Sequence, residues 1–181
     1  STEGKKSRKI VEYGIEALKA VWHRGAIDAD GKTGDGAGIH IEIPYDFFVE
    51  KIETKGHKHD NSEICVGMIF LPRDNFSVQE ECKTIVEKEL TKSNFKIYGW
   101  RQVPINTKVL GEKANNNRPE ITQILFKYND KTLLDKNLER KLYEIRRKIE
   151  NEIIKSNIEG FYICSLSSKS IIYKGMFLAE E

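Results

Sequence analysis

The 181-residue sequence has few cysteines, almost no net charge and no long apolar run, and each absence excludes a class of protein. Cys65, Cys82 and Cys164 lie far apart inside apolar stretches, which indicates neither a zinc site nor a disulfide framework. Buried, reduced thiols are expected instead. Lys and Arg number 30 against 28 Asp and Glu, so no strong field attracts nucleic acid or anionic lipid.

No apolar run approaches the roughly 20 residues of a membrane span, and the polar start of the chain lacks the hydrophobic segment of a signal peptide. These absences predict a cytoplasmic protein with no nucleic-acid and no membrane partner. Since 39% of the residues are hydrophobic, the chain can bury one sizeable core and is expected to be one domain or a large part of one.

Hydrophobic spacing predicts three helices and six strands. Helical spacing covers residues 9–22, 77–90 and 134–155, Ser77 and Glu80 predict a capping box, and a helical turn is expected over 45–52. The expected strands are 39–43, 64–71, 95–103, 121–128, 161–166 and 171–178, with a long loop over 104–119. The last two strands are expected to form a hairpin, and apolar and polar residues alternate within the strands. Both features favour an antiparallel or mixed sheet, and hence the α+β class.

The glycine-rich segment from Asp30 to Gly38 matches no phosphate-binding pattern. Residues 31–33 resemble the end of a P-loop, but Ala26 stands where the pattern needs a glycine. A helix precedes the segment and a strand follows it, the reverse of the order that cradles phosphate in P-loops and dinucleotide folds. A tight turn that leads into a strand is the favoured interpretation.

Two other clusters also receive a structural interpretation. His57 and His59 lie in a lysine-rich loop without further ligands, so a solvated loop is expected there and no metal site. Basic and aromatic residues mix in the strand 95–103, but the basic excess of the chain is too small for a nucleic-acid platform. From residue chemistry, the sequence predicts an α+β domain without a complete catalytic constellation.

A series of short segments runs through the chain from His23 onward, specific in its order more than in any one member. The segments are His23-Arg24-Gly25-Ala26, Thr33-Gly34-Asp35-Gly36-Ala37-Gly38, Ile43-Pro44, Asp46-Phe47-Phe48, Phe70-Leu71-Pro72-Arg73-Asp74, Gly99-Trp100-Arg101, Val103-Pro104, Val109-Leu110-Gly111-Glu112-Lys113-Ala114, Arg118-Pro119, Cys164-Ser165-Leu166-Ser167-Ser168 and Tyr173-Lys174-Gly175-Met176. This series resembles the N-terminal amidotransferase domain of glutamate synthase large subunits.

The resemblance implies a class II glutamine amidotransferase with the N-terminal nucleophile hydrolase fold, in which two sheets face each other between helical layers. In such enzymes an N-terminal Cys attacks the side-chain amide of L-glutamine, and its α-amine is the general base. A γ-glutamyl thioester forms, ammonia leaves, and an Asn side chain and a Gly amide stabilise the oxyanion. The ammonia then reaches a separate flavin site, where 2-oxoglutarate becomes glutamate.

The resemblance further implies that residues 1–181 are part of a single amidotransferase domain, without the nucleophile strand and the C-terminal glutamine-binding half. Ser1 begins a stretch too polar for the apolar strand that a nucleophile opens, so it is expected to be a loop residue. The chain alone is then expected to be inactive. The alternative is a non-catalytic binding or assembly module on the same scaffold.

Arg24 is the one candidate functional residue, because the resemblance places its segment beside the nucleophile. Arg24 either holds the nucleophile strand and favours the thiolate, or anchors the preceding helix end to the loop through carbonyl groups. No metal ligand, cofactor site or glutamine-binding residue is expected in the chain. The expected structural loop consists of Gly25, Thr33, Gly34, Asp35, Gly36 and Gly38.

For the parent enzyme, the resemblance implies FMN and an iron-sulfur cluster. The implied partners are the remaining domains of the large subunit, and a small subunit or ferredoxin as electron donor.

Overall fold

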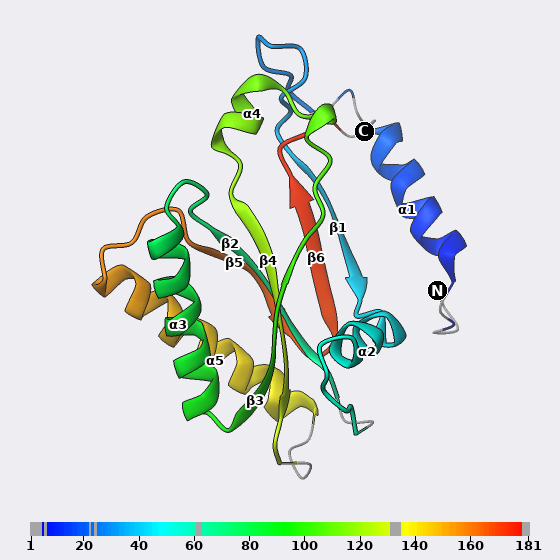
Figure 1. Cartoon of the computed structure of the whole chain (residues 1–181). Coiled ribbons are helices and arrows are strands. Elements are labelled where there is room, and N and C mark those ends of the chain that lie inside the picture. The colour runs from blue at the N-terminus through cyan, green and yellow to red at the C-terminus, as the bar shows by residue number, and fades with distance from the viewer. Residues whose placement is uncertain are drawn as a thin grey trace. The chain divides into compact units, whose positions relative to one another are not determined.

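The computed structural model describes residues 5, 7–21, 23, 25–60, 63–130 and 135–178 (Figure 1). Helices and antiparallel strands alternate along the chain, which confirms the predicted α+β class. The chain divides into two compact units: His40–Pro104 with Pro119–Ile172, and Ser1–Ile39 with Ile105–Arg118 and Tyr173–Glu181.

The larger unit is built on a four-stranded antiparallel sheet in the order β3-β4-β2-β5. Its strands are β2 (Cys65–Leu71), β3 (Phe95–Gln102), β4 (Glu120–Tyr128) and β5 (Tyr162–Ser167). The central strand β2 pairs with both β4 and β5, and six of its seven residues are buried. The continuous apolar run that predicted a strand buried on both faces is therefore confirmed.

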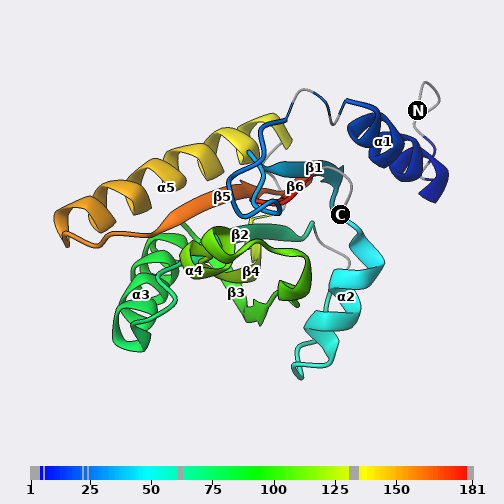
Figure 2. The same cartoon turned by 90° about the horizontal axis from the view of Figure 1, so that it is seen from above.

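Helices α3 (Phe76–Lys92) and α5 (Asp135–Lys155) cover one face of this sheet (Figures 1 and 2), since both pack into one hydrophobic core with β2 and β4. The residues of α5 at helical spacing, Leu138, Leu142, Ile145, Ile149 and Ile153, join the same hydrophobic core as β2 and β4. Burial of each such side chain stabilises the fold by about 1.5–3 kcal/mol. This core explains why the predicted long helix forms where its apolar stripe lies.

The opposite face of the sheet carries the alternate side chains of the same strands, because successive residues of a strand point to opposite sides. Val66 and Met68 are almost fully buried on it. Helix α2 (Tyr45–Glu53) lies at the β3 end of this face, where the Arg101 guanidinium stands 5.1 Å from the centre of the Phe47 ring. Arg101 also donates to the buried Gln123 side chain at 2.8 Å.

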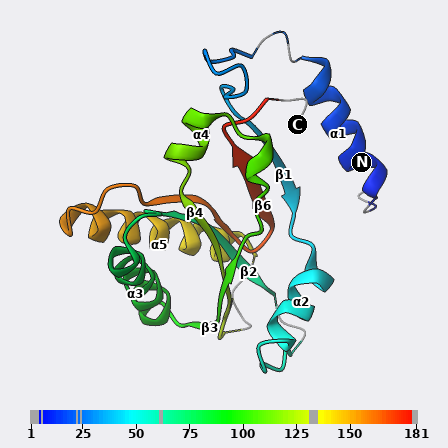
Figure 3. The same ribbon diagram turned by 45° about the horizontal axis from the view of Figure 1, so that its top comes forward.

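Strands β1 (Ala37–Glu42) and β6 (Ser170–Gly175) form a separate two-stranded sheet, in which β6 lies beside β1 (Figure 3). The predicted hairpin of the last two strands is therefore wrong, since β5 pairs with β2. The physical reason lies in the turn between them. Glu139 of α5 accepts hydrogen bonds from the Ser168 N–H and hydroxyl and from the Ser167 hydroxyl, and Ser167 Oγ accepts from the Lys169 and Ser170 N–H groups.

Two local predictions are also wrong. Helix α3 begins after Asn75, whose side chain accepts from the Val78 N–H at 3.1 Å, so the cap is not Ser77. Asn is as good an N-cap as Ser, and this one stands two positions earlier. The segment predicted as a long loop contains a 3₁₀ turn η2 (Thr107–Val109) and the short helix α4 (Glu112–Asn117).

The smaller unit holds α1 (Arg8–Ala20), η2 and α4. Helix α1 confirms the predicted helix as far as Ala20, with Val21 as its C-cap, and Trp22 lies outside the described residues; none of the residues of α1 is buried. The small unit is therefore held by its loops and not by an apolar stripe of α1.

We predict that Leu142→Ala lowers the free energy of unfolding by about 2–5 kcal/mol, because it leaves a cavity in the α3–α5 core. The matched control is its neighbour Tyr143, which is 63% exposed. Tyr143→Ala should change the free energy by about 0.5 kcal/mol or less. Urea unfolding followed by circular dichroism measures both, and equal losses for the two variants would contradict this core assignment.

Candidate functional site

The glycine-rich segment closes on itself as a small antiparallel loop. The Asp28 N–H donates to the Thr33 carbonyl at 2.8 Å, and the Asp35 N–H donates to the Ala26 carbonyl at 3.3 Å. The Asp35 carboxylate accepts the Ala26 N–H at 2.8 Å in return. Both ends of the loop are thereby fixed by backbone and side-chain bonds.

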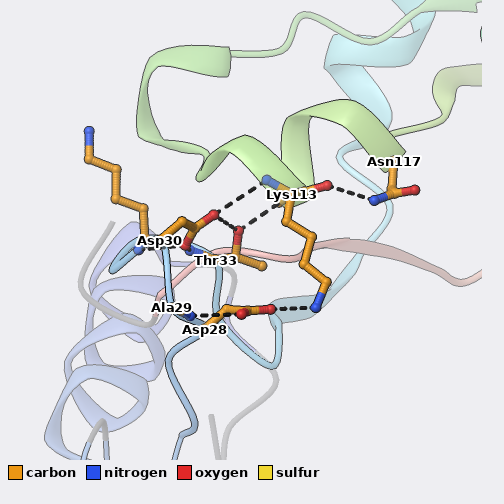
Figure 4. A network of polar contacts seen from close by, with 8 residues as sticks. Asp28, Ala29, Asp30, Thr33, Lys113 and Asn117 are labelled. Carbon is orange, nitrogen blue, oxygen red and sulfur yellow. Dashed lines mark hydrogen bonds and ion pairs between the residues drawn. The ribbon is translucent and has the colours of Figure 1, made fainter.

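The Asp30 carboxylate organises this loop and extends to a distant segment (Figure 4). Its Oδ1 accepts the N–H groups of Lys32 at 3.0 Å and Thr33 at 2.7 Å. Its Oδ2 accepts the Thr33 hydroxyl at 2.5 Å and the Lys113 N–H at 3.3 Å. These hydrogen bonds, led by the one from the Thr33 hydroxyl, hold the pKa of Asp30 well below its usual range.

Asp30 and Thr33 together cap helix α4 from outside its own segment. The first N–H groups of a helix lack intrahelical partners, and Gly111, the residue before α4, has no side chain to supply one. Asp30 accepts from Lys113, and the buried Thr33 hydroxyl accepts the Ala114 N–H at 3.3 Å. A Cβ on Gly111 would lie 2.3 Å from Asp30 Oδ2 and from Thr33 Oγ1, so the contact requires glycine there.

An exposed ion pair adds to this contact. Lys113 Nζ donates to Asp28 Oδ2 at 2.5 Å, which lowers the pKa of Asp28 and raises that of Lys113. Water screens such a pair, so it contributes less than the caps beside it. The Asn117 side chain donates to the Lys113 carbonyl at 2.8 Å within the same helix (Figure 4).

The predicted loop residues are placed as follows. Thr33 and Gly34 are buried, and a Cβ on Gly34 would lie 2.7 Å from the Phe177 carbonyl oxygen. Asp35 and Gly36 are exposed, Gly38 lies in β1, and Gly25 is an exposed bend. Arg24 lies outside the described residues, as does Ser1. The structural role of this loop stays a prediction.

Sequence reasoning missed Asp30, Gly111 and Ala114 as parts of the same contact. Two of the segments that carry the resemblance, residues 33–38 and 109–114, meet at this contact. Their presence in one series was a signal that both belong to one structural element, but nothing in the spacing indicated that they touch.

The three cysteines are poor candidates for a nucleophile. All three are buried. Burial raises the pKa of Cys65 well above its usual range and the pKa of Cys82 to about 11, so these two thiols stay protonated at neutral pH. The Cys164 thiol donates to the Ile172 carbonyl at 3.6 Å. An iron-sulfur cluster needs several converging thiolates, and among the described residues no three such ligands lie together, so these cysteines do not fit one.

The histidine loop of the larger unit differs in part from the prediction of a solvated segment. His59 is half-buried, with Nε2 at 2.8 Å from the Tyr45 hydroxyl and Nδ1 at 3.2 Å from the Tyr98 hydroxyl. Asp60 accepts from Lys127 at 2.6 Å. The loop is thus bound to α2, β3 and β4. Lys58 is exposed, as the prediction of a solvated loop requires.

Within the described ranges, no three His, Cys, Asp or Glu side chains lie close enough to hold a metal ion. In the same part of the chain, no helix has the length and apolar character that crossing a bilayer requires.

Comparison with known proteins gives one consistent result. The model of the class-II glutamine amidotransferases matches residues 1–181. The chain is 56% identical over 179 residues to the glutamate synthase [NADPH] large chain of Azospirillum brasilense, which covers 99% of this chain and 12% of that protein. It is 41% identical over 177 residues to the ferredoxin-dependent glutamate synthase of Pyropia yezoensis, covering 94% of this chain and 11% of that protein. The chain therefore spans about an eighth of the length of these curated relatives.

We predict that Thr33→Val lowers the free energy of unfolding by about 1–3 kcal/mol, because the buried Ala114 N–H loses its acceptor. Thr33→Ser keeps the hydroxyl and should cost about 1 kcal/mol or less, the value of one buried methyl group. Limited proteolysis within residues 105–118 should follow the same order. If the Thr33→Val and Thr33→Ser variants are cleaved equally fast, the Thr33 hydroxyl does not cap α4.

Proposed function

Since the chain belongs to the class-II glutamine amidotransferases, we propose that it is part of the glutamine-hydrolysing domain of a glutamate synthase large chain. The observation that carries this proposal is the family match over all 181 residues together with 56% identity to a glutamate synthase large chain. The substrate is L-glutamine. The ammonia released serves to convert 2-oxoglutarate to glutamate elsewhere in the same enzyme.

We further propose that residues 1–181 belong to one amidotransferase domain and not to two. The chain passes between its two compact units four times, after residues 39, 104, 118 and 172. Units connected so often are parts of one domain, because separate domains are usually joined where few connections cross. The two-stranded sheet β1–β6 is marginal by itself, which favours further strands from the rest of the polypeptide.

The chemistry proposed for the intact domain uses an N-terminal Cys nucleophile that these residues do not supply. Cys65 and Cys82 are protonated and buried, and attack on an amide needs an accessible thiolate or an adjacent base. We therefore infer that the chain alone is inactive. A non-catalytic binding or assembly module on the same scaffold is the alternative, and the same buried thiols are compatible with it.

For Arg24, two roles are proposed side by side. It either holds the nucleophile strand and favours the thiolate by its charge, or anchors the end of the preceding helix to the loop by hydrogen bonds to carbonyl groups. Arg24→Lys separates them, because lysine keeps the charge and loses the planar, multiple-donor guanidinium.

Cofactors and partners belong to the proposed parent enzyme. We expect FMN and an iron-sulfur cluster in the parent enzyme and none in this chain, and we propose as partners the remaining domains of the large chain, with a small subunit or ferredoxin as electron donor. The names of the relatives specify NADPH in one case and ferredoxin in the other, so they favour no single donor for this protein. A cytoplasmic location stays a prediction.

Ammonia release from glutamine tests this proposal. We predict none above the buffer background for the 181-residue chain, and steady turnover for a large chain that contains it. Turnover by the chain alone would contradict its inactivity. A large chain that makes glutamate from added ammonia but releases none from glutamine would favour the non-catalytic module.

A further inference from the structure

The connection between β3 and β4 is hydrogen-bonded to the glycine-rich loop, and one of the loop residues involved, Asp30, belongs to none of the segments that carry the resemblance. Residues 105–118 of this connection group with residues 1–39. Asp30 accepts the Lys113 N–H across 83 positions of sequence, and Thr33, which Asp30 itself holds by two bonds, accepts the Ala114 N–H. Asp30 therefore lies where two segments of the chain join.

We propose that Asp30 is a positioning residue for glutamine hydrolysis, which locks the loop of residues 25–38 onto α4. The proposal rests on the function proposed above. Asp30 is not proposed to touch any reacting atom. It acts by fixing the loop whose first residues continue from the segment that we propose to lie beside the nucleophile.

The position of Asp30 is coupled to the entry of the loop at Ala26, because hydrogen bonds join the two sides of the loop along its length. Asp30 holds the N–H and hydroxyl of Thr33, and the Thr33 carbonyl accepts the Asp28 N–H. Ile27 and Gly34 form a bridge, and the final pair joins Asp35 to Ala26 at the entry of the loop. A shift of the turn therefore moves the entry as well.

A carboxylate is needed at position 30 because all four of its partners donate. Lys32 and Thr33 donate N–H groups to Oδ1, and the Thr33 hydroxyl and the Lys113 N–H donate to Oδ2. An ionised carboxylate is acceptor-only, whereas asparagine must present an NH₂ group on one side. Asp30→Asn thus sets a donor against donors without changing the size of the side chain.

Asp28 provides a matched control in the same loop. Its carboxylate binds Lys113 through the exposed Nζ and also accepts the Ala29 N–H beside it. Asp28→Asn makes the same chemical change as Asp30→Asn and removes the same formal charge. It leaves the caps of α4 in place.

The experiment uses a large chain that contains these residues, with glutamine or with added ammonia as the nitrogen source. We expect Asp30→Asn to lower kcat for glutamine-dependent turnover by roughly 10- to 100-fold at nearly unchanged KM, as a misplaced reacting group does. The ammonia-dependent rate should stay as in the parent. Asp28→Asn should change the rate of either reaction by no more than about twofold, because it removes only an exposed ion pair.

Gly111→Ala is the second variant, because it displaces α4 while Asp30 is intact, and it should reproduce the loss of kcat. The proposal is overturned if Asp30→Asn leaves glutamine-dependent kcat within about twofold, as Asp28→Asn should. It is also overturned if Asp30→Asn lowers the ammonia-dependent rate as much as the glutamine-dependent rate, because that result indicates a general loss of structure. It is also overturned if KM alone rises. Absence of glutamine hydrolysis in the unaltered large chain is a different result, since it removes the proposed function itself.

Discussion

The capping of α4 by Asp30 and Thr33 is the contact on which the order of the smaller unit depends. A helix of six residues is too short to be stable by its own hydrogen bonds, and its preceding residue, Gly111, has no side chain that could cap it. Because the caps come from the glycine-rich loop, the helix and the loop stabilise each other. Glycine at 111 is part of the same constraint, since any larger residue would separate them.

The larger unit depends on a different kind of interaction. Its sheet and two covering helices are held by many buried apolar side chains, whereas the smaller unit depends on a few directional bonds. None of the residues of α1 is buried, so that helix adds no apolar core of its own. This protein is therefore expected to tolerate conservative apolar changes in the larger unit better than the loss of one hydrogen-bond acceptor in the smaller unit.

The sequence predicted well those elements whose cause is local. The apolar stripe of α5 and the apolar run of β2 identified both, because burial follows directly from their spacing. Helix α4 was missed because its caps are supplied by Asp30 and Thr33, far away in the chain. Strand β6 was paired with β5 because the hydrogen bonds that the turn between them donates to Glu139 could not be foreseen. For the site, glycine content predicted a tight loop at 30–38, while the contact of Asp30 with Lys113 required the structure.

Amide hydrogen exchange at Lys113 and Ala114 tests the mutual capping most directly. The first N–H groups of an uncapped short helix exchange nearly as fast as those of an unfolded chain, since they have no acceptor. The structure predicts that both amides are protected, and that Thr33→Val removes protection at Ala114 while β4 remains protected. Exchange of Ala114 at the unfolded rate in the unaltered chain, with β4 still protected, would contradict the account.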